Sequence, residues 1–327
     1  MVSQSPASRD RNLQPQASKA RQARGGPSSL FIVGAPRTGT TSLAKALAGH
    51  PQVCFSKPKE THFFLRSLPD AAVEDVRRRY ERAYFPNRGP QHGCIAEGSV
   101  SYLYDPSAIG RILAFDPEAL FVVGLRNPLE LLPSYHARLL YTMDEDVTDF
   151  SRAWALQARR MRREQIPPRC RDPRLLLYGE VGRLGAHLQR LIEVAGRERC
   201  FLYLFEDFRA EPRRTYREML EFARLPDHKA EVRHKNSGRS YRSKWLQPFV
   251  MNPPAPIARM IGVLADGGHA RLRSLVRPLR RRLKRVNALP ARRETLTPEL
   301  RRELCEYYRE DVSHLERLLG RELRWLV

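Results

Sequence analysis

The segment "FIVGAPRTGTTSLAKAL", Phe31 to Leu47, has the glycine spacing of a phosphate-binding loop. A Walker loop reads GxxxxGK followed by Ser or Thr, where the lysine neutralises the outer phosphates and the hydroxyl binds magnesium. Gly34 and Gly39 keep this spacing, but Thr40 stands at the lysine position and the cation inside the loop is Arg37. Backbone N–H groups that lead into a helix N-terminus still suit a phosphate and need no metal. The loop is therefore predicted to hold a nucleotide phosphate without a metal-bridged γ-phosphate.

A second candidate phosphate contact lies in "LFVVGLRNPLELLPSYHARL", Leu120 to Leu139. In many NTPases a buried strand of this kind ends in the aspartate that orders magnesium. Here the strand ends in Arg126, and an arginine repels a metal ion and binds phosphate. Ser134, eight positions further on, adds a hydroxyl for the same group. One phosphate at the loop and one at Arg126 describe a nucleotide that is phosphorylated at two separate places.

Strands and helices must position these residues, and the apolar pattern predicts both. The predicted strands are 29–35, 53–55, 94–97, 120–125 and 200–205, and the predicted helices are 41–51, 73–85 and 181–196. This alternation predicts an α/β fold: a P-loop-type parallel sheet flanked by helices, with ligands at the carboxyl ends of the strands. We expect a single domain over residues 28–327 behind a disordered basic tail, residues 1–27.

The composition changes from about Asn236, where the chain becomes rich in proline and arginine. The segment 271–286 places leucines at helical spacing against arginines, which fits an anionic acceptor, an anionic membrane or a solvated helix face. The last segment predicts a packing helix with one apolar face, made of Leu300, Leu304, Tyr307, Tyr308, Val312, Leu315 and Leu318.

The charge of the chain points to anionic partners. The 327 residues carry a formal charge of +22, which fits nucleic acid, an acidic glycan, a nucleotide or a membrane surface. Only 8 of the 58 basic residues are lysine, so a genome that favours arginine codons explains the excess equally well.

Cysteine usage and the lack of long apolar runs bear on the compartment. The five cysteines are odd in number and far apart with no CxxC pair, which argues against a disulfide framework or a zinc site. We expect no metal. The first 27 residues lack the apolar run of a signal peptide, and no segment reaches 18 uninterrupted apolar residues. The sequence therefore predicts a soluble cytoplasmic protein.

Four motifs in order, "PRTGTTSL", "KPKETHFF", "EGSVSYLYDP" and "LRNPLELLPSYH", resemble the sulfotransferases that use 3′-phosphoadenosine 5′-phosphosulfate (PAPS). The likeness is to the bacterial and heparan-sulfate-type branch. "NSGRSY" and the ending "YYREDVSHLERLLGRELRWL" extend it over nearly the whole chain beyond the tail.

The resemblance implies PAPS as co-substrate and assigns its contacts. The 5′-phosphosulfate would be bound by Arg37, Thr38, Gly39, Thr40, Thr41 and Ser42, the 3′-phosphate by Arg126 and Ser134, and the nucleotide would be covered by a late loop with Gly238, Arg239 and Tyr241. Two positions depart from the family pattern: Arg37 replaces a frequent lysine, and Ser237 stands where a lysine often precedes the late glycine. Arg239 or Lys235 would then supply that charge.

The resemblance also implies the catalytic residues. Sulfuryl transfer needs stabilisation of the leaving phosphate, assigned to Arg37, and a base for the acceptor proton. The glutamate of "KPKETHFF" is the base in the heparan-type branch, so Glu60 takes that role and His62 is a substrate contact or an alternative base. The competing interpretations are a solvated Glu60 and a His62 at the edge of the core. Ser99 and Tyr102 occupy another family element and are catalytic or structural.

The acceptor and two other functions remain open at this stage. The heparan-type likeness favours a glycan or glycolipid, with O- or N-sulfation undecided. A P-loop kinase or NTPase that uses ATP is the alternative, disfavoured by Thr40 and Arg126 where lysine and aspartate would stand. A nucleic-acid-binding protein fits the charge, but no specific binding motif is present and we expect no specific nucleic-acid partner.

Overall fold

The computed structural model describes residues 28–66, 72–232, 239–243, 246–247, 282–283, 286–290 and 295–326. The chain divides into two compact units: Met1–Leu131, Arg183–Lys235 and Leu304–Val327 form the first, and Leu132–Gly182 with Asn236–Glu303 form the second. The tail 1–27 and nearly all of 271–286 lie outside the described residues. That residues 28–327 act as one domain stays a prediction.

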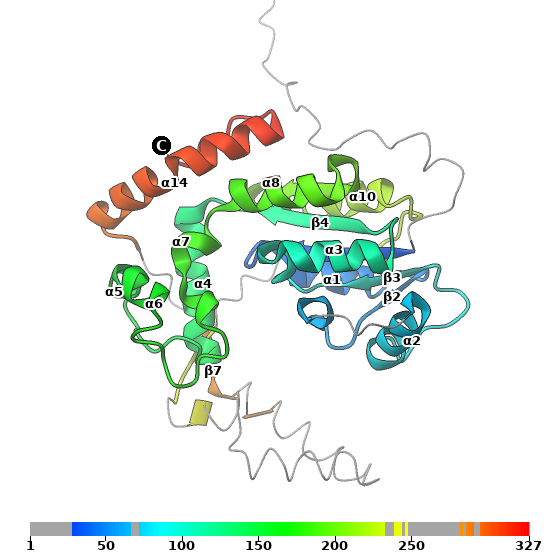
Figure 1. The fold of residues 1–327 in the computed structure, drawn as a ribbon, viewed down its shortest axis with the longest axis horizontal. Coiled ribbons are helices and arrows are strands. Elements are labelled where there is room, and N and C mark those ends of the chain that lie inside the picture. The colour runs from blue at the N-terminus through cyan, green and yellow to red at the C-terminus, as the bar shows by residue number, and fades with distance from the viewer. Residues whose placement is uncertain are drawn as a thin grey trace, which may run out of the picture. The chain divides into compact units, whose positions relative to one another are not determined.

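The first unit is built on a parallel sheet of five strands, as the apolar runs predict (Figure 1). The strands are β1 (Ser29–Gly34), β2 (Val53–Phe55), β3 (Cys94–Glu97), β4 (Leu120–Leu125) and β5 (Cys200–Leu204), in the order β2-β3-β1-β4-β5. Phe31 pairs with Glu97 on one side and with Phe121 on the other, so β1, β3 and β4 end at the same edge. The predicted α/β class is confirmed.

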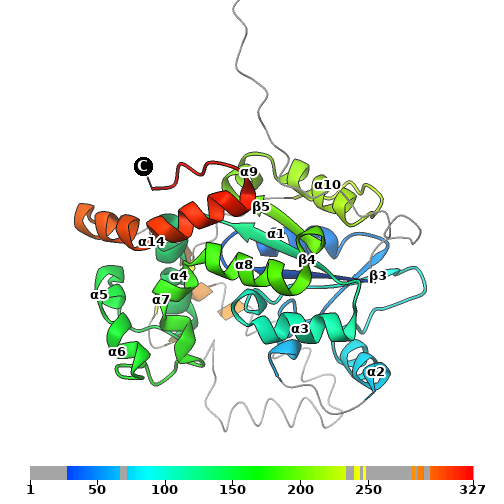
Figure 2. The same ribbon diagram turned by 45° about the horizontal axis from the view of Figure 1, so that its top comes forward.

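Helices cover both faces of this sheet. They are α1 (Thr40–Leu47), α2 (Val73–Tyr84), α3 (Pro106–Phe115), α8 (Leu184–Ala195), α9 (Phe205–Ala210) and α10 (Pro212–Phe222), with the 3-10 turns η2 (Phe63–Leu65), η3 (Tyr102–Tyr104) and η5 (Arg197–Arg199). Figure 2 shows α3 and α8 on the near side of the sheet and α1 behind it, and residues of α10 share an apolar cluster with those of α1. Two covered faces explain why the strands are continuous apolar runs.

Side chains on the two faces of β1 pack into different parts of the core. Leu30 and Ile32 pack with α1 and α10 residues in one apolar cluster. Phe31 points the other way, since side chains alternate along a strand, and it stacks on Phe121 and meets Phe64 edge to face. Phe64 in turn contacts Tyr80 of α2 at a ring distance of 5.1 Å. This aromatic cluster anchors the η2 turn directly after "KPKETH".

The C-terminal helix α14 (Pro298–Leu319) confirms most of its predicted face. Leu300, Leu304, Tyr308, Val312 and Leu315 are buried, as is Leu319. Tyr307 was wrongly included: it is 42% exposed, and the Arg183 guanidinium packs over its ring at 5.3 Å. Leu318 is only half-buried. Tyr307 is turned 100° around the helix from the buried Tyr308, which places it outside the buried stripe.

The second unit holds short helices and a two-stranded sheet. Its elements are α4 (Pro128–Thr142, which begins in the first unit), α5 (Phe150–Ala155), α6 (Gln157–Met161), η4 (Pro173–Leu176), α7 (Tyr178–Val181), and the antiparallel strands β6 (Arg239–Tyr241) and β7 (Ala288–Pro290). A buried ion pair between Arg160 and Glu145 holds this unit, and the Tyr178 hydroxyl donates to the same carboxylate at 2.8 Å.

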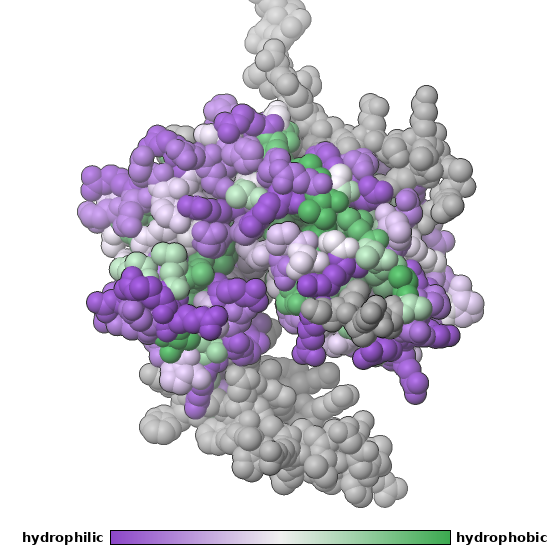
Figure 3. Space-filling model, in the orientation of Figure 1, coloured by the Kyte–Doolittle hydropathy of each residue, from purple (hydrophilic) through white to green (hydrophobic). Residues whose placement is uncertain are grey.

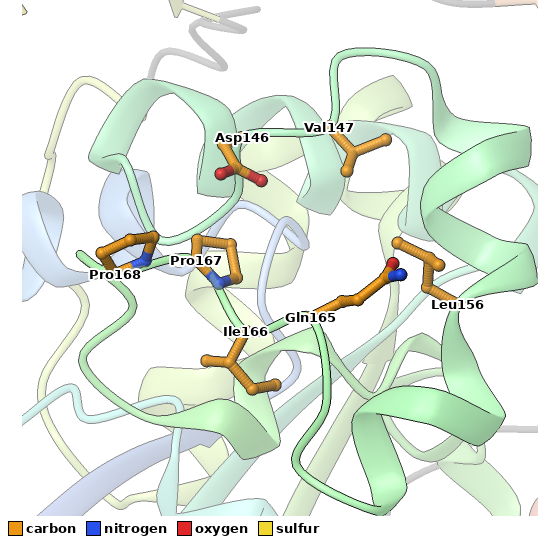
Figure 4. Close-up of a pocket in the computed structure, with 7 residues that line it drawn as sticks. All are labelled: Asp146, Val147, Leu156, Gln165, Ile166, Pro167 and Pro168. Carbon is orange, nitrogen blue, oxygen red and sulfur yellow. The ribbon is translucent and has the colours of Figure 1, made fainter.

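The surface fits the composition. The face drawn in Figure 3 is mainly hydrophilic, with smaller apolar areas between charged side chains. A hollow of about 190 Å³ in the second unit is lined by Asp146, Val147, Leu156, Gln165, Ile166, Pro167 and Pro168 (Figure 4). It contains no residue that the sequence analysis assigns to a ligand.

Candidate active site

The phosphate-binding loop lies between β1 and α1 and is tied to the neighbouring strands. The Ala35 N–H donates to the Gly124 carbonyl of β4 at 2.8 Å, and the Tyr203 hydroxyl of β5 donates to the Thr38 carbonyl at 3.0 Å. Gly39 has a φ of 89°, and a Cβ there would lie 2.3 Å from the Phe208 ring. Both conditions require glycine, so the loop shape is fixed before any ligand binds.

The hydroxyl-bearing residues of the loop differ in their burial. Thr38 is fully buried and its hydroxyl donates to the Ala35 carbonyl at 2.7 Å, so its side chain shapes the loop. Thr40 is 5% exposed. Thr41 is exposed and Ser42 half-buried at the first turn of α1, where the Ser42 N–H donates to the Gly39 carbonyl at 2.8 Å. For Thr38, the predicted contact with phosphate is therefore left to its backbone N–H, because its hydroxyl is bonded within the loop.

Arg126 follows β4 and reaches back to the loop. Its guanidinium donates from Nη1 to the Arg37 carbonyl and from Nη2 to Glu130, both at 3.0 Å. It also packs over the Phe205 ring at 4.3 Å and is 8% exposed. The two predicted phosphate contacts are thus neighbours. The Glu130 carboxylate, 55% exposed, already occupies one side of the guanidinium, so an incoming phosphate must share or replace it.

The C-terminal segment closes the same edge of the sheet at β5. The Asn127 side chain donates to the Trp325 carbonyl at 2.8 Å, and the Trp325 indole N–H donates to Glu206 at 2.8 Å. A hollow of about 330 Å³ lies there, lined by Leu204, Glu206 and residues 321–325. The sequence analysis gave this ending no role beyond likeness, and the structure shows that it holds the residue next to Arg126.

Glu60 and His62 lie side by side on the segment before η2. The Glu60 carboxylate is 3.2 Å from the Lys59 ammonium through Oε1 and 3.8 Å from the His62 Nε2 through Oε2. Their side chains are 40% and 48% exposed. The His62 Nδ1 is 2.9 Å from the Ser101 hydroxyl. Both side chains are exposed enough to meet a substrate, and the choice between a substrate role and a core-edge role for His62 stays a prediction.

A buried carboxylate that the sequence analysis missed lies beneath this pair. Glu97, at the end of β3, is 1% exposed and accepts hydrogen bonds from the Tyr80 and Ser99 hydroxyls and, at 3.4 Å, from the Thr61 N–H. Burial raises the pKa of the Glu97 carboxyl above its usual value. The sequence analysis placed Glu97 at the end of the predicted strand 94–97 and gave its carboxylate no role.

Ser99 and Tyr102 have the structural role that the sequence left open. The Ser99 hydroxyl accepts from the His62 N–H at 3.0 Å, and the Tyr102 hydroxyl accepts from the Phe64 N–H at 3.2 Å. Gly98, where the family often has lysine, leaves room for the Lys59 side chain, whose ammonium donates to the Gly98 carbonyl at 2.7 Å.

The remaining predicted nucleotide contacts belong to the second unit. Ser134 lies half-buried on α4. Arg239 and Tyr241 form β6 and pair with Pro290 and Ala288 of β7. Gly238 lies outside the described residues. These contacts stay predictions.

Other candidate chemistry in the described part of the chain is limited. Among the described residues no three His, Cys, Asp or Glu side chains gather as a metal site. All five cysteines are free thiols. His50 and His136, taken as structural, bond to the Pro226 and Val147 carbonyls. Within the described helices, none combines the length and apolar character that a membrane crossing requires.

Three comparisons with known proteins each find similarity to sulfotransferases. Residues 27–106 match the model of the Sulfotransferase family. Carbohydrate sulfotransferase 15 of mouse is 29% identical over 32% of this chain and 26% of its own length, and the rat protein matches to the same extent. This chain thus spans about a quarter of those relatives. A sulfotransferase from Alicyclobacillus acidocaldarius has the same fold, with a TM-score of 0.60, 23% identity and coverage of 92% of this chain and 99% of that one.

Proposed function

We propose that this chain, which carries a sulfotransferase domain, transfers a sulfuryl group from PAPS to a hydroxyl or amine, with Glu60 as general base. The observation that carries this proposal is the 3.0 Å hydrogen bond from Arg126 to the Arg37 carbonyl. It joins a phosphate loop without the Walker lysine to an arginine at the end of β4. Two phosphate-binding groups at one sheet edge fit a nucleotide phosphorylated at two places.

The described residues fit such a nucleotide. Arg37 is half-buried in the loop before α1, and Thr41 and Ser42 lie in the first turn of that helix, where the 5′-phosphosulfate would bind. Arg126 would hold the 3′-phosphate in place of part of its contact with Glu130. By resemblance the remaining contacts are proposed to come from Thr38, Gly39, Thr40, Ser134, Gly238, Arg239 and Tyr241.

The chemistry proposed for these residues is a single displacement at sulfur. The acceptor oxygen or nitrogen forms a bond to sulfur while the bond from sulfur to the 5′-phosphate oxygen breaks. The acceptor proton passes to the Glu60 carboxylate, and such a base contributes about 100- to 10,000-fold in rate. Charge that grows on the leaving phosphate is stabilised by Arg37 and the loop N–H groups. His62, 3.8 Å from Glu60, contacts the acceptor or replaces Glu60 as base.

A carbohydrate is the proposed acceptor class, free or lipid-linked. The support is that the matched mouse and rat relatives are carbohydrate sulfotransferases, although the match covers 26% of their length. A peripheral contact of segment 271–286 with an anionic membrane and a cytoplasmic location belong to the same proposal.

Binding of adenosine 3′,5′-bisphosphate in EDTA tests the function class. The nucleotide should raise the melting temperature without metal, because a ligand at 100 times its Kd stabilises a fold by about 2.7 kcal/mol. Arg126→Ala should abolish most of that rise, and Arg162→Ala, which removes an exposed arginine of the second unit, should not. A larger rise with magnesium ATP would overturn the proposal in favour of a P-loop kinase or NTPase.

A further inference from the structure

The segment that carries Glu60 and His62 is held through its backbone by side-chain oxygens. Four successive N–H groups donate to side chains: Thr61 to Glu97, His62 to Ser99, Phe63 to the Thr61 hydroxyl and Phe64 to Tyr102, at 3.0 to 3.4 Å. A backbone held at four consecutive residues has little freedom left, so the two side chains start from a fixed frame.

Glu97 lies at the centre of these contacts. Its carboxylate takes the Thr61 N–H directly and holds the Ser99 hydroxyl, whose oxygen in turn accepts the His62 N–H. The Tyr80 hydroxyl of α2 donates to its other oxygen. Loss of the carboxylate would therefore release the Thr61 N–H directly and loosen the Ser99 hydroxyl that holds the His62 N–H.

The backbone at His62 needs such support. Its φ is 53°, in the left-handed region that a residue with a Cβ adopts only at a cost in free energy. Conformations of this kind persist only where the surroundings over-determine them. The Ser99 hydroxyl bonds to the strained residue itself. Without the Glu97 contact, an unstrained extended conformation of His62 would compete with the left-handed one.

The charge of Glu97 also needs an explanation, since a buried carboxylate is costly. Within the described part of the chain its donors are uncharged, and burial raises its pKa. It cannot serve as the base itself, because it is 1% exposed and its oxygens are engaged. Three donors converge on it, and the two carboxylate oxygens accept all three: Oε1 from Ser99 and Thr61, and Oε2 from Tyr80.

We propose that Glu97 is a positioning residue that fixes the backbone of residues 60–64 and thereby orients Glu60 and His62. For catalysis this inference rests on the proposed sulfuryl transfer. The structural part of the inference, that Glu97 fixes this backbone, does not depend on the proposed function. Tyr80 and Ser99 belong to the same unit, because each donates to the Glu97 carboxylate.

The test compares two buried tyrosine–glutamate pairs. Tyr80→Phe and Glu97→Gln loosen the proposed unit, and Tyr80→Phe keeps the ring and is the milder change. Tyr178→Phe is the matched control, because Tyr178 is also fully buried and also donates to a buried carboxylate, that of Glu145. Amide hydrogen exchange of the peptide covering 59–66 is measured in all three, together with the Kd of adenosine 3′,5′-bisphosphate.

We expect Tyr80→Phe and Glu97→Gln to speed exchange at residues 61–64 by about tenfold or more, with the nucleotide Kd unchanged, and Tyr178→Phe to leave that exchange as in the wild type. In the transfer assay, turnover at saturating PAPS should fall about 10- to 100-fold while KM for PAPS is kept. Unchanged exchange in both variants, or equal loosening by Tyr178→Phe, would overturn the inference. If the wild type transfers no sulfate, the proposed function fails, and the exchange result still decides the role of Glu97.

Discussion

Each unit contains a buried carboxylate that accepts a hydrogen bond from a buried tyrosine, but the other partners of the two carboxylates differ. Glu97 accepts from Tyr80 and from uncharged groups, whereas Glu145 accepts from Tyr178 and forms a fully buried ion pair with Arg160. Burial is the largest influence on both and works to raise both pKa values. At Glu145 the contacts with Arg160, the Val147 N–H and Tyr178 together outweigh burial and the pKa is lowered, whereas at Glu97 it remains raised.

The difference shows what each carboxylate does. The ion pair of Glu145 joins α6 to the segment after α4, so its charge is compensated and serves the packing of the second unit. At Glu97 burial leaves the pKa raised and no hydrogen-bond donor among the described residues is charged, in a carboxyl that contacts the backbone between Glu60 and His62. Costly ionisable groups of this kind gather at functional sites. We therefore assign the Glu145 pair to stability and the Glu97 pair to position.

The largest expected effect separates the two glutamates by stability. Glu145→Gln leaves the Arg160 guanidinium buried and uncompensated, and breaking a buried pair in this way costs about 3–5 kcal/mol. Glu97→Gln removes a charge that burial disfavours and misplaces one hydrogen bond, a cost of about 1–3 kcal/mol. Urea unfolding of both variants measures this. Equal losses, or a larger loss for Glu97→Gln, would remove the distinction.

The two sites should also respond to acid with opposite signs. The pKa of Glu145 is lowered in the folded protein, so its contribution is present above the usual value of 4.5 and is lost as the pH falls through the lowered value. The pKa of Glu97 is raised, so its contribution is complete below 4.5 and is lost as the pH rises through the raised value.

Unfolding free energies at pH 3 to 7 measure these slopes as differences from the matched Gln variants. The gap between wild type and Glu145→Gln should narrow in acid, and the gap between wild type and Glu97→Gln should widen. Parallel slopes for the two pairs would contradict the cause assigned to each pKa.

The smallest effect is expected at the ion pair on the surface of the same site. Lys59 and Glu60 are 3.2 Å apart with side chains 21% and 40% exposed, and exposed pairs contribute about 0.2–1 kcal/mol. Lys59→Met should therefore change the free energy of unfolding by no more than this. A loss comparable to that of Glu145→Gln would mean that the Lys59 contact to Gly98, and not Glu97, holds the segment.

The sequence predicted the sheet and the loop because their signals are local. Buried parallel strands are continuous apolar runs, and Gly39 marks a left-handed position that nothing larger fills. It also placed Arg126 near the loop, since parallel strands end at one edge. The structural role of the Thr38 hydroxyl could not be predicted from the sequence. A hydroxyl that binds phosphate and one that stabilises the loop have the same sequence pattern, and only the position of the Ala35 carbonyl distinguishes them.

Glu97 could not be predicted, because its meaning depends on another element. In "CIAEGS" it is the last residue of the predicted strand 94–97, and a glutamate in that place is normally solvated. Its burial depends on Tyr80, 17 residues earlier on α2, and on how the 59–64 segment folds back over β3. No periodicity records such a contact. The same holds for the Trp325 contacts at the other end of the sheet edge.

The central claim is that Glu60 is the base of a sulfuryl transfer, and the transfer of labelled sulfate from PAPS into an extract of the source cell tests it most directly. Single-turnover rates are compared for wild type, Glu60→Gln and His62→Ala, with nucleotide affinity measured alongside. The account predicts that Glu60→Gln is slower by about 100- to 10,000-fold with its affinity for adenosine 3′,5′-bisphosphate intact. A Glu60→Gln variant that transfers near the wild-type rate, with His62→Ala inactive, would contradict it and make His62 the base.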